Sequence, residues 1–116
     1  AHMKYNLKQY KTIEKDLNAI LNHNNLIPQA NFLMALVKYS QGDYNAAEQF
    51  GQKVLSIVSD HYESMYIIGR ADFKLKRMHQ AEKYFTKILF RYPDDLEVQY
   101  TLARIYLSQN KAEQAL

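Results

Sequence analysis

The sequence predicts an all-α protein, in which antiparallel helix pairs repeat along the chain as an α–α solenoid. Three observations lead to this fold class. No segment alternates apolar and polar residues with a period of two, apolar residues recur with helical spacing, and small residues return at a fixed interval. Units of this kind bury their apolar faces against the units on either side of them.

The interval of 34 residues is shared by small and aromatic residues. It separates the members of three series: Ala35, Gly69 and Ala103; Ala47, Ala81 and Ala115; and Phe32, Tyr66 and Tyr100. Aliphatic residues keep the same interval at 21, 55 and 89. So many coincidences at one interval indicate an internal repeat.

Each period divides into two predicted helices. The apolar spacing predicts helices over residues 6–23, 29–41, 44–58, 62–76, 79–91 and 96–108, with a further one starting near 111. Pro28 can open the helix that follows it, and Gly42 with Asp43 supplies a break and a cap. Pro93 ends a helix, and Asp94 with Asp95 can cap the next.

Gly69 interrupts an otherwise helical apolar stretch, where glycine costs about 1 kcal/mol relative to alanine. We expect Gly69 and Ala81 to face each other on two antiparallel helices, so that the backbones approach closely and neighbours such as Phe85 interdigitate. One large buried side chain contributes about 1.5–3 kcal/mol, which offsets the penalty. A chance glycine is the alternative, but Ala35 and Ala103 repeat the need for a small residue.

The bulk composition excludes several classes of protein. The 116 residues suit one domain with a modest core, and 47% of them are apolar, which argues against a disordered chain. No apolar run is long enough to cross a bilayer, and the net charge of +3 is too small to indicate nucleic acid. The absence of cysteine fits a reducing compartment, and we expect a cytoplasmic location.

The two ends of the sequence suggest a piece cut from a longer protein. Residues 1–3 look like a vector-derived remnant, and the last residues stop inside an amphipathic pattern without a cap.

The 34-residue period resembles the tetratricopeptide repeat. In that family position 8 of each repeat is small, position 20 is alanine, position 24 is aromatic and position 32 is proline. The two small-residue series above fall at positions 8 and 20, while Phe85 and Pro93 fall at positions 24 and 32. The chain departs from the family at Gly51, which replaces the aromatic residue of position 24, and it lacks the family's tryptophan.

The resemblance implies a right-handed superhelical stack. It places the second helix of a partial repeat at residues 4–27, repeats at 28–61 and 62–95, and a first helix with a truncated second helix at 96–116.

In the resembled family the first helix of each pair lines a concave groove that binds a peptide or a helix. Nine residues of this chain fall at such positions: Phe32, Leu36, Tyr39, Tyr66, Arg70, Phe73, Lys74, Tyr100 and Arg104. Arginine beside tyrosine is typical of binding hot spots. The apolar members of the set could instead pack against neighbouring helices, and the arginines could simply be solvated.

One specialised use of the family does not fit this sequence. The clamp that holds the C-terminal carboxylates of heat-shock chaperones needs lysine at position 5 and asparagine at position 9 of its first repeat. Phe32 and Leu36 take those places here. The resemblance therefore does not imply a chaperone clamp.

Two basic stripes have helical spacing. Arg70, Lys74 and Arg77 form one, and residues 83, 87 and 91 form the other. An acidic or phosphorylated partner would explain them, and so would ordinary solvation, which we favour for the second stripe.

The sequence shows no catalytic or metal-binding signature. The histidines are far apart, there is no glycine-rich phosphate loop or nucleophile elbow, and Asp94 with Asp95 resembles a helix cap. We therefore expect neither an enzyme nor a cofactor.

Our leading hypothesis is a non-catalytic interaction module of a larger scaffold or adaptor protein, with a protein or peptide ligand. The alternatives are an architectural segment that self-assembles through its repeat ends as a homo-oligomer, and an RNA-binding helical repeat. The modest charge argues against the RNA-binding alternative.

Overall fold

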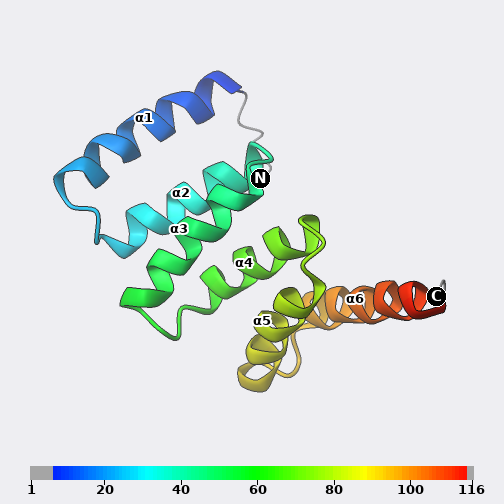
Figure 1. The fold of residues 1–116 in the computed structure, drawn as a ribbon. Helices are drawn as coiled ribbons and strands as arrows, with labels where there is room; N and C mark the ends of the chain where they lie inside the picture. Colours follow the sequence, from blue (N-terminus) through cyan, green and yellow to red (C-terminus); the bar gives the residue numbers. More distant parts are fainter. Residues whose placement is uncertain (1–6, 115–116) are drawn as a thin grey trace.

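The computed structural model describes the backbone of residues 7–114 and the side chains of residues 9–110. This range contains six helices and no strand (Figure 1). They are α1 (Leu7–His23), α2 (Pro28–Ser40), α3 (Tyr44–Ile57), α4 (Tyr62–Lys74), α5 (Met78–Arg91) and α6 (Leu96–Gln114). The expected all-α fold is confirmed. The expected remnant at residues 1–3, and Ala115, lie outside the described residues.

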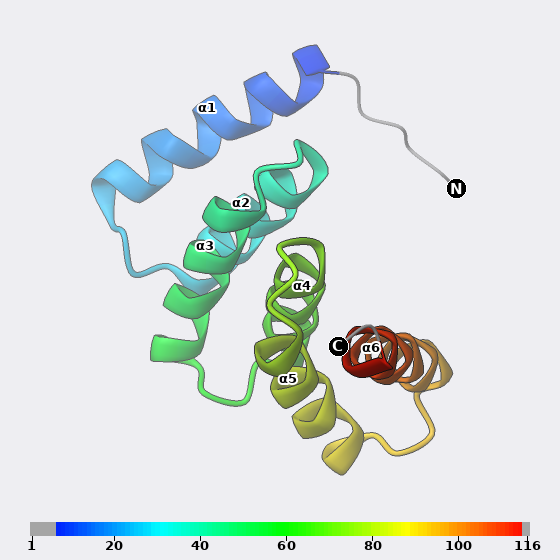
Figure 2. The same cartoon turned by 45° about the vertical axis from the view of Figure 1, so that its right-hand side comes forward.

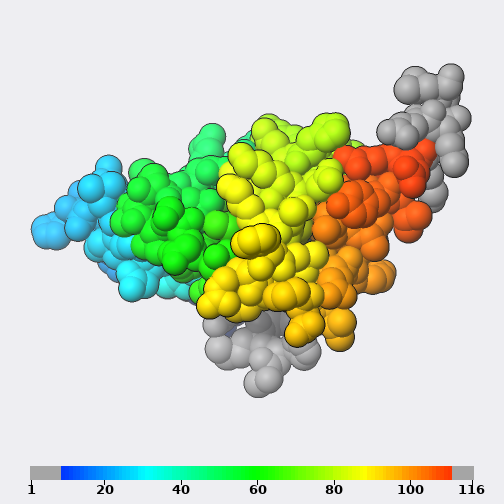
Figure 3. All heavy atoms as spheres, turned by 90° about the horizontal axis from the view of Figure 1, so that it is seen from below, coloured from blue at the N-terminus to red at the C-terminus, as the bar shows by residue number. Residues whose placement is uncertain are grey.

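The helices form a stack in which each packs mainly on its neighbours in the sequence. The antiparallel pair α2–α3 is followed by the pair α4–α5, with α1 at one end and α6 at the other (Figures 1 and 2). The molecule measures 48 × 30 × 29 Å. In the space-filling view, α5 lies between the end that contains α1–α3 and the end that contains α6 (Figure 3). This arrangement is that of a helical-repeat solenoid.

Local sequence signals set most of the helix ends as expected. Pro28 is the first residue of α2, and the Asp43 side chain accepts a hydrogen bond of 3.2 Å from the Ala46 amide at the start of α3. The turn before α3 uses Gly42 at φ 81°, a left-handed conformation that suits glycine. One period later, Lys76 has the same kind of conformation with φ 65°.

The last helix differs from the sequence prediction. A break was expected near residues 108–111, yet α6 continues unbroken to Gln114. Asn110 occupies the place in its period that Gly42 and Lys76 occupy in theirs. In those periods a second helix packs back on the first and stabilises the turn. Only six residues follow Asn110 in this sequence, too few for a stable second helix, so the helical backbone simply continues.

The absence of a described second helix in this period also changes the surroundings of Ala103. Its counterparts Ala35 and Gly69 are buried, whereas Ala103 is exposed. The demand for a small residue at this position therefore comes from the partner helix rather than from the helix that carries the residue.

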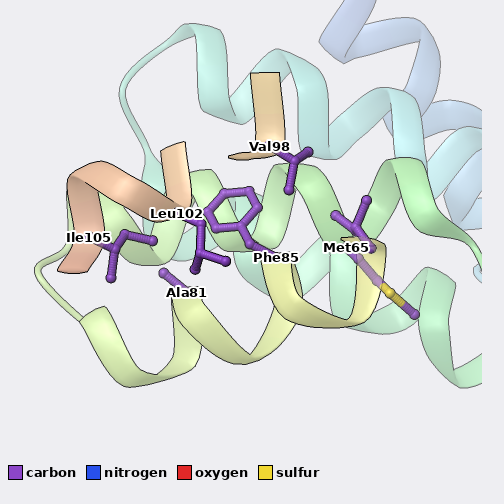
Figure 4. Close-up of a cluster of buried hydrophobic side chains, with 7 residues drawn as sticks. Met65, Ala81, Phe85, Val98, Leu102 and Ile105 are labelled. Carbon is purple, nitrogen blue, oxygen red and sulfur yellow. The ribbon is translucent and has the colours of Figure 1, made fainter. Parts of the chain in front are cut away.

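The close approach at Gly69 is filled by an aromatic ring. A Cβ atom at this position would lie 2.9 Å from Cζ of Phe85 and 3.1 Å from each of its Cε atoms. Gly69 and Ala81 are both buried, but the group nearest to Gly69 is the Phe85 ring and not the Ala81 methyl group. Side chains from α4, α5 and α6 surround this ring (Figure 4).

A second close approach compensates for the missing aromatic residue at Gly51. A Cβ atom there would lie 2.6 Å from Cγ1 of Ile68, which is fully buried. Ile68 comes from α4, the first helix of the next pair. An aromatic residue on α3 would fill this space. Here Ile68, a side chain of the following period, fills it instead.

A buried carboxylate marks the end of α4. Asp72 is fully buried, and neither of its oxygens accepts a hydrogen bond from the described residues. Nη1 of Arg77 lies 4.0 Å from Asp72 Oδ1 and 3.2 Å from Oε1 of Glu48, while Nη2 donates to Asn45 over 3.2 Å. Arg77 thereby connects the α4–α5 turn to α3.

Replacing Gly69 by alanine should destabilise the protein by about 1 kcal/mol. The new methyl group crowds the Phe85 ring, which costs about 1–3 kcal/mol, and the gain in helix propensity of about 1 kcal/mol offsets part of this. In a Phe85→Leu background the ring atoms that crowd the methyl group are gone, so Gly69→Ala should be neutral or stabilising there. Denaturant unfolding of the four proteins measures this coupling. Equal effects in both backgrounds would contradict the proposed contact.

Replacing Arg77 by methionine should destabilise the protein by about 1–2 kcal/mol. The change leaves the buried Asp72 carboxylate without a nearby cation, and the partial exposure of Arg77 keeps the loss below that of a fully buried ion pair. In an Asp72→Asn background the same replacement should cost less, because no buried charge remains. Thermal unfolding of both pairs tests this, and an identical cost in the two backgrounds would show that Asp72 does not depend on Arg77.

Candidate functional site

The nine predicted groove residues lie on α2, α4 and α6, the helices that begin each period. They line two pockets on the molecule. The large pocket encloses about 510 Å³ and includes Phe32, Leu36 and Tyr66. The basic pocket encloses about 220 Å³ and includes the other six: Tyr39, Arg70, Phe73, Lys74, Tyr100 and Arg104. Glu97 lines both pockets, so they adjoin.

Arg70 connects the three helices at the boundary between the pockets. Its Nε donates a hydrogen bond of 3.1 Å to the hydroxyl of Tyr39 on α2, and its Nη1 donates one of 3.1 Å to the hydroxyl of Tyr66 on α4. The same Nη1 lies 3.8 Å from Oε1 of Glu97 on α6. The guanidinium carbon is 5.6 Å from the centre of each tyrosine ring, within the range of a cation–π contact.

The protonation states of this junction follow from its surroundings. Burial by itself lowers the pKa of Arg70, but the hydrogen bonds to Tyr66 and Tyr39 outweigh it, so that the pKa is raised and the side chain stays charged. Burial also raises the pKa of Tyr66, and hydrogen bonding to the Glu97 carboxylate raises it further. Tyr66 therefore keeps its proton at neutral pH. The junction is a fixed cation held by the hydroxyl groups of two tyrosines.

Two cations of the basic pocket remain available to a ligand. Arg104 lies over the rings of Phe73 and Tyr100, with its guanidinium carbon 5.3 and 5.9 Å from their centres. Lys74 is exposed. Neither side chain has a carboxylate within ion-pair distance among the residues whose side chains are described. Tyr100 is itself 66% exposed, so the pocket presents an aromatic surface beside free positive charge.

Arg77 does not belong to this surface, although its spacing from Arg70 and Lys74 predicted one basic stripe. The helix ends at Lys74, before the stripe is complete, and Arg77 turns instead toward Glu48 and Asn45 on α3. Helical spacing predicts a shared face only for residues within one helix, and Arg77 lies beyond the end of α4.

Sequence reasoning missed part of the large pocket. Tyr62, Tyr92 and Asp95 line it together with Glu63 and Glu97. Glu63 and Glu97 are 34 residues apart and fall at a groove-lining position of the resembled family, whereas Tyr92 and Asp95 belong to the connection between α5 and α6 and were not among the predicted residues. Asp95 also caps α6, since its Oδ1 accepts a hydrogen bond of 3.1 Å from the Val98 amide.

The apolar residues of the groove are neither core nor free surface. Phe32, Leu36 and Phe73 are all half-buried. The Phe32 ring stands edge-on to His61 at 5.0 Å, and the Phe73 side chain packs against the cluster around Phe85. Each has one side supported by the protein and another open to the groove.

The described part of the chain offers neither a metal site nor a membrane-spanning helix. No group of three or more histidine, cysteine, aspartate and glutamate residues there could hold a metal ion. None of the helices within it combines the length and the apolar character needed to span a bilayer.

Solved structures of similar fold include two domains that are described as containing tetratricopeptide repeats. The first such domain of Spaghetti (RPAP3), bound to the HSP90 peptide SRMEEVD, has a TM-score of 0.83 at 16% identity, over 89% of this chain and 82% of that one. MamA has a TM-score of 0.84 at 14% identity, over 97% of this chain and 70% of the other. The C-terminal repeat domain of a Plasmodium falciparum protein described as FK506-binding has a TM-score of 0.70 at 15% identity, with 92% of each chain covered. At these identities the likeness concerns the fold.

Family models identify the chain more directly. No curated protein matches the sequence. The family model described as anaphase-promoting complex, cyclosome, subunit 3 matches residues 6–88, and a model described as tetratricopeptide repeat matches residues 74–116. Since the first of these models covers well over half of the sequence, the chain belongs to the family of anaphase-promoting complex, cyclosome, subunit 3, and it is a tetratricopeptide-repeat protein.

Proposed function

We propose that this chain is a non-catalytic interaction module of a larger scaffold or adaptor protein, and that it binds a peptide or a helix along the face formed by α2, α4 and α6. The observation that carries the proposal is the set of cations held in place by aromatic rings, with Arg70 fixed between two tyrosines and Arg104 lying over two further rings. Side chains that are ordered before binding lose little entropy when the ligand arrives.

The chemistry of the basic pocket favours an anionic group on the ligand. Lys74 and Arg104 are unpaired among the described residues, and Arg70 is already oriented, so a carboxylate or a phosphate would find three donors in one small pocket. Tyr66 and Tyr100 would contribute apolar contact area next to this charge. We therefore propose an acidic or phosphorylated partner.

The ligand should be held by contacts other than those of the chaperone clamp. In this chain Phe32 and Leu36 occupy the places of the clamp lysine and asparagine that the chaperone-binding members of the family need. Both line the large pocket, where they offer apolar surface and no hydrogen-bond donor from their side chains.

A second function, as an assembly segment of a multisubunit complex, is supported by one structural observation. Ala103 is exposed on α6, as is Leu107, of which 60% is exposed. The name of the matched family refers to a subunit of a complex. We propose that this face of α6 is covered in the assembled protein by further repeats or by another chain. Light scattering tests self-association directly, and a strict monomer at high concentration would exclude association through copies of this chain.

The groove assignment predicts that Arg104→Glu weakens binding of selected peptides at least tenfold. Peptides of twelve residues would be selected on the immobilised protein from a display library and then titrated in solution. Because Arg104 is exposed, its replacement should leave the melting temperature almost unchanged.

Lys87→Glu is the matched control for this experiment. Lys87 is also exposed and also lies over a ring, that of Tyr84, but it belongs to α5, outside both pockets. The control should bind the selected peptides as the original protein does. Equal binding by all three proteins would place the peptide site elsewhere and would refute the groove assignment.

A further inference from the structure

The two adjoining pockets carry opposite charge. The basic pocket contains Arg70, Lys74 and Arg104 with one carboxylate, Glu97. The large pocket contains the carboxylates of Glu63, Asp95 and Glu97, and no lysine or arginine lies among its lining residues. The groove is therefore polarised along its length.

The body of the large pocket is aromatic and aliphatic. The rings of Tyr62 and Tyr92 stand edge to face with centres 5.3 Å apart, and Tyr66 and Phe32 complete the aromatic lining. Ring faces attract cations, and long basic side chains combine an apolar stem with a charged end. A volume of about 510 Å³ has room for such a side chain together with an apolar neighbour.

The carboxylates of the large pocket retain capacity for a further cation. Glu63 is largely exposed and lies 3.8 Å from Nε2 of His61, and no lysine or arginine among the residues whose side chains are described lies within ion-pair distance of it. Glu97 is also largely exposed and lies 3.8 Å from Arg70, longer than a direct hydrogen bond. A carboxylate has about four acceptor sites, so Glu63, and Glu97 in addition to its hydrogen bond from Tyr66, can accept hydrogen bonds from a ligand's ammonium or guanidinium group.

We propose that the ligand is an extended peptide segment of a partner protein that carries charges of both signs. A lysine or arginine enters the large pocket, and a carboxylate or phosphate enters the basic pocket. This inference rests on the proposed function. It adds that the ligand must carry a positive charge, and that its two charges have a fixed order along the groove.

The helix geometry sets the spacing of the two charges in the ligand. On α4 the large pocket is lined by residues 62, 63, 66 and 67, and the basic pocket by residues 70, 73 and 74. The centres of these two sets are about eight residues apart, which is about 12 Å at a rise of 1.5 Å per residue. An extended peptide rises about 3.3 Å per residue, so the cation and the anion should be about three or four residues apart.

The test uses short fluorescein-labelled peptides and the full chain. One peptide has arginine and glutamate four positions apart with leucine and serine between them, and a second has the same residues in the reverse order. Control peptides carry two arginines, two glutamates or two glutamines at the same positions. In fluorescence anisotropy at low salt, one of the two bipolar peptides should bind at least tenfold more tightly than every control peptide.

A charge exchange at Glu63 then tests the large pocket itself. Glu63→Lys should weaken binding of the bipolar peptide at least tenfold and should strengthen binding of the peptide with two glutamates. Asp16→Lys, at an exposed residue of α1 outside both pockets, makes the same change in net charge and should alter neither affinity. Melting temperatures of both variants verify that the fold is retained.

The outcomes separate this inference from the function on which it rests. If the peptide with two glutamates binds as well as the bipolar peptides and Glu63→Lys has no effect, while Arg104→Glu still weakens binding, the cationic requirement is wrong and the groove remains a peptide site. If no peptide responds to either replacement, or none binds, both proposals are overturned.

Discussion

The contact between Gly69 and the Phe85 ring is the constraint on which the rest of the structure depends. A ring less than 3 Å from the position of a missing Cβ atom fixes how closely α4 and α5 approach. The ring in turn is surrounded by apolar side chains of α6, so one contact determines how the next helix is placed. On α4, Tyr66 stands edge-on to this ring with ring centres 5.9 Å apart, and Arg70 and Lys74 follow at intervals of four residues and line the basic pocket.

The two glycine contacts show how a degenerate repeat keeps a continuous core. In one pair an aromatic ring on the second helix fills the space over Gly69. In the other pair the glycine is on the second helix, at Gly51, and Ile68 of the following pair fills the space. Large and small side chains have exchanged places between neighbouring helices, and the volume between them stays filled. Close packing constrains the sum of the volumes more strongly than it constrains each position.

Three of the four arginines of the chain have different roles, which their identical chemistry does not reveal. Arg77 forms ion pairs with Glu48 and the buried Asp72, and so contributes to the fold. Arg70 is hydrogen-bonded to two tyrosines and shapes the boundary between the pockets. Arg104 lies over two rings without an anionic partner among the described residues, and it is the arginine best placed to meet an anionic ligand.

By itself, the sequence determined the repeat, the first five helices and the helices that carry most of the residues lining the two pockets. These features arise from periodic burial and local turn chemistry, which leave a regular trace in the order of residues. Only the tertiary structure decided that Phe85 rather than Ala81 meets Gly69, that Arg77 leaves the basic stripe, and that α6 continues past Asn110. The contribution of Asp95 to the large pocket also required the fold, because this residue reaches the pocket from a loop. Contacts between helices depend on side-chain direction and on neighbours that are distant in the sequence. A local sequence pattern therefore does not predict them.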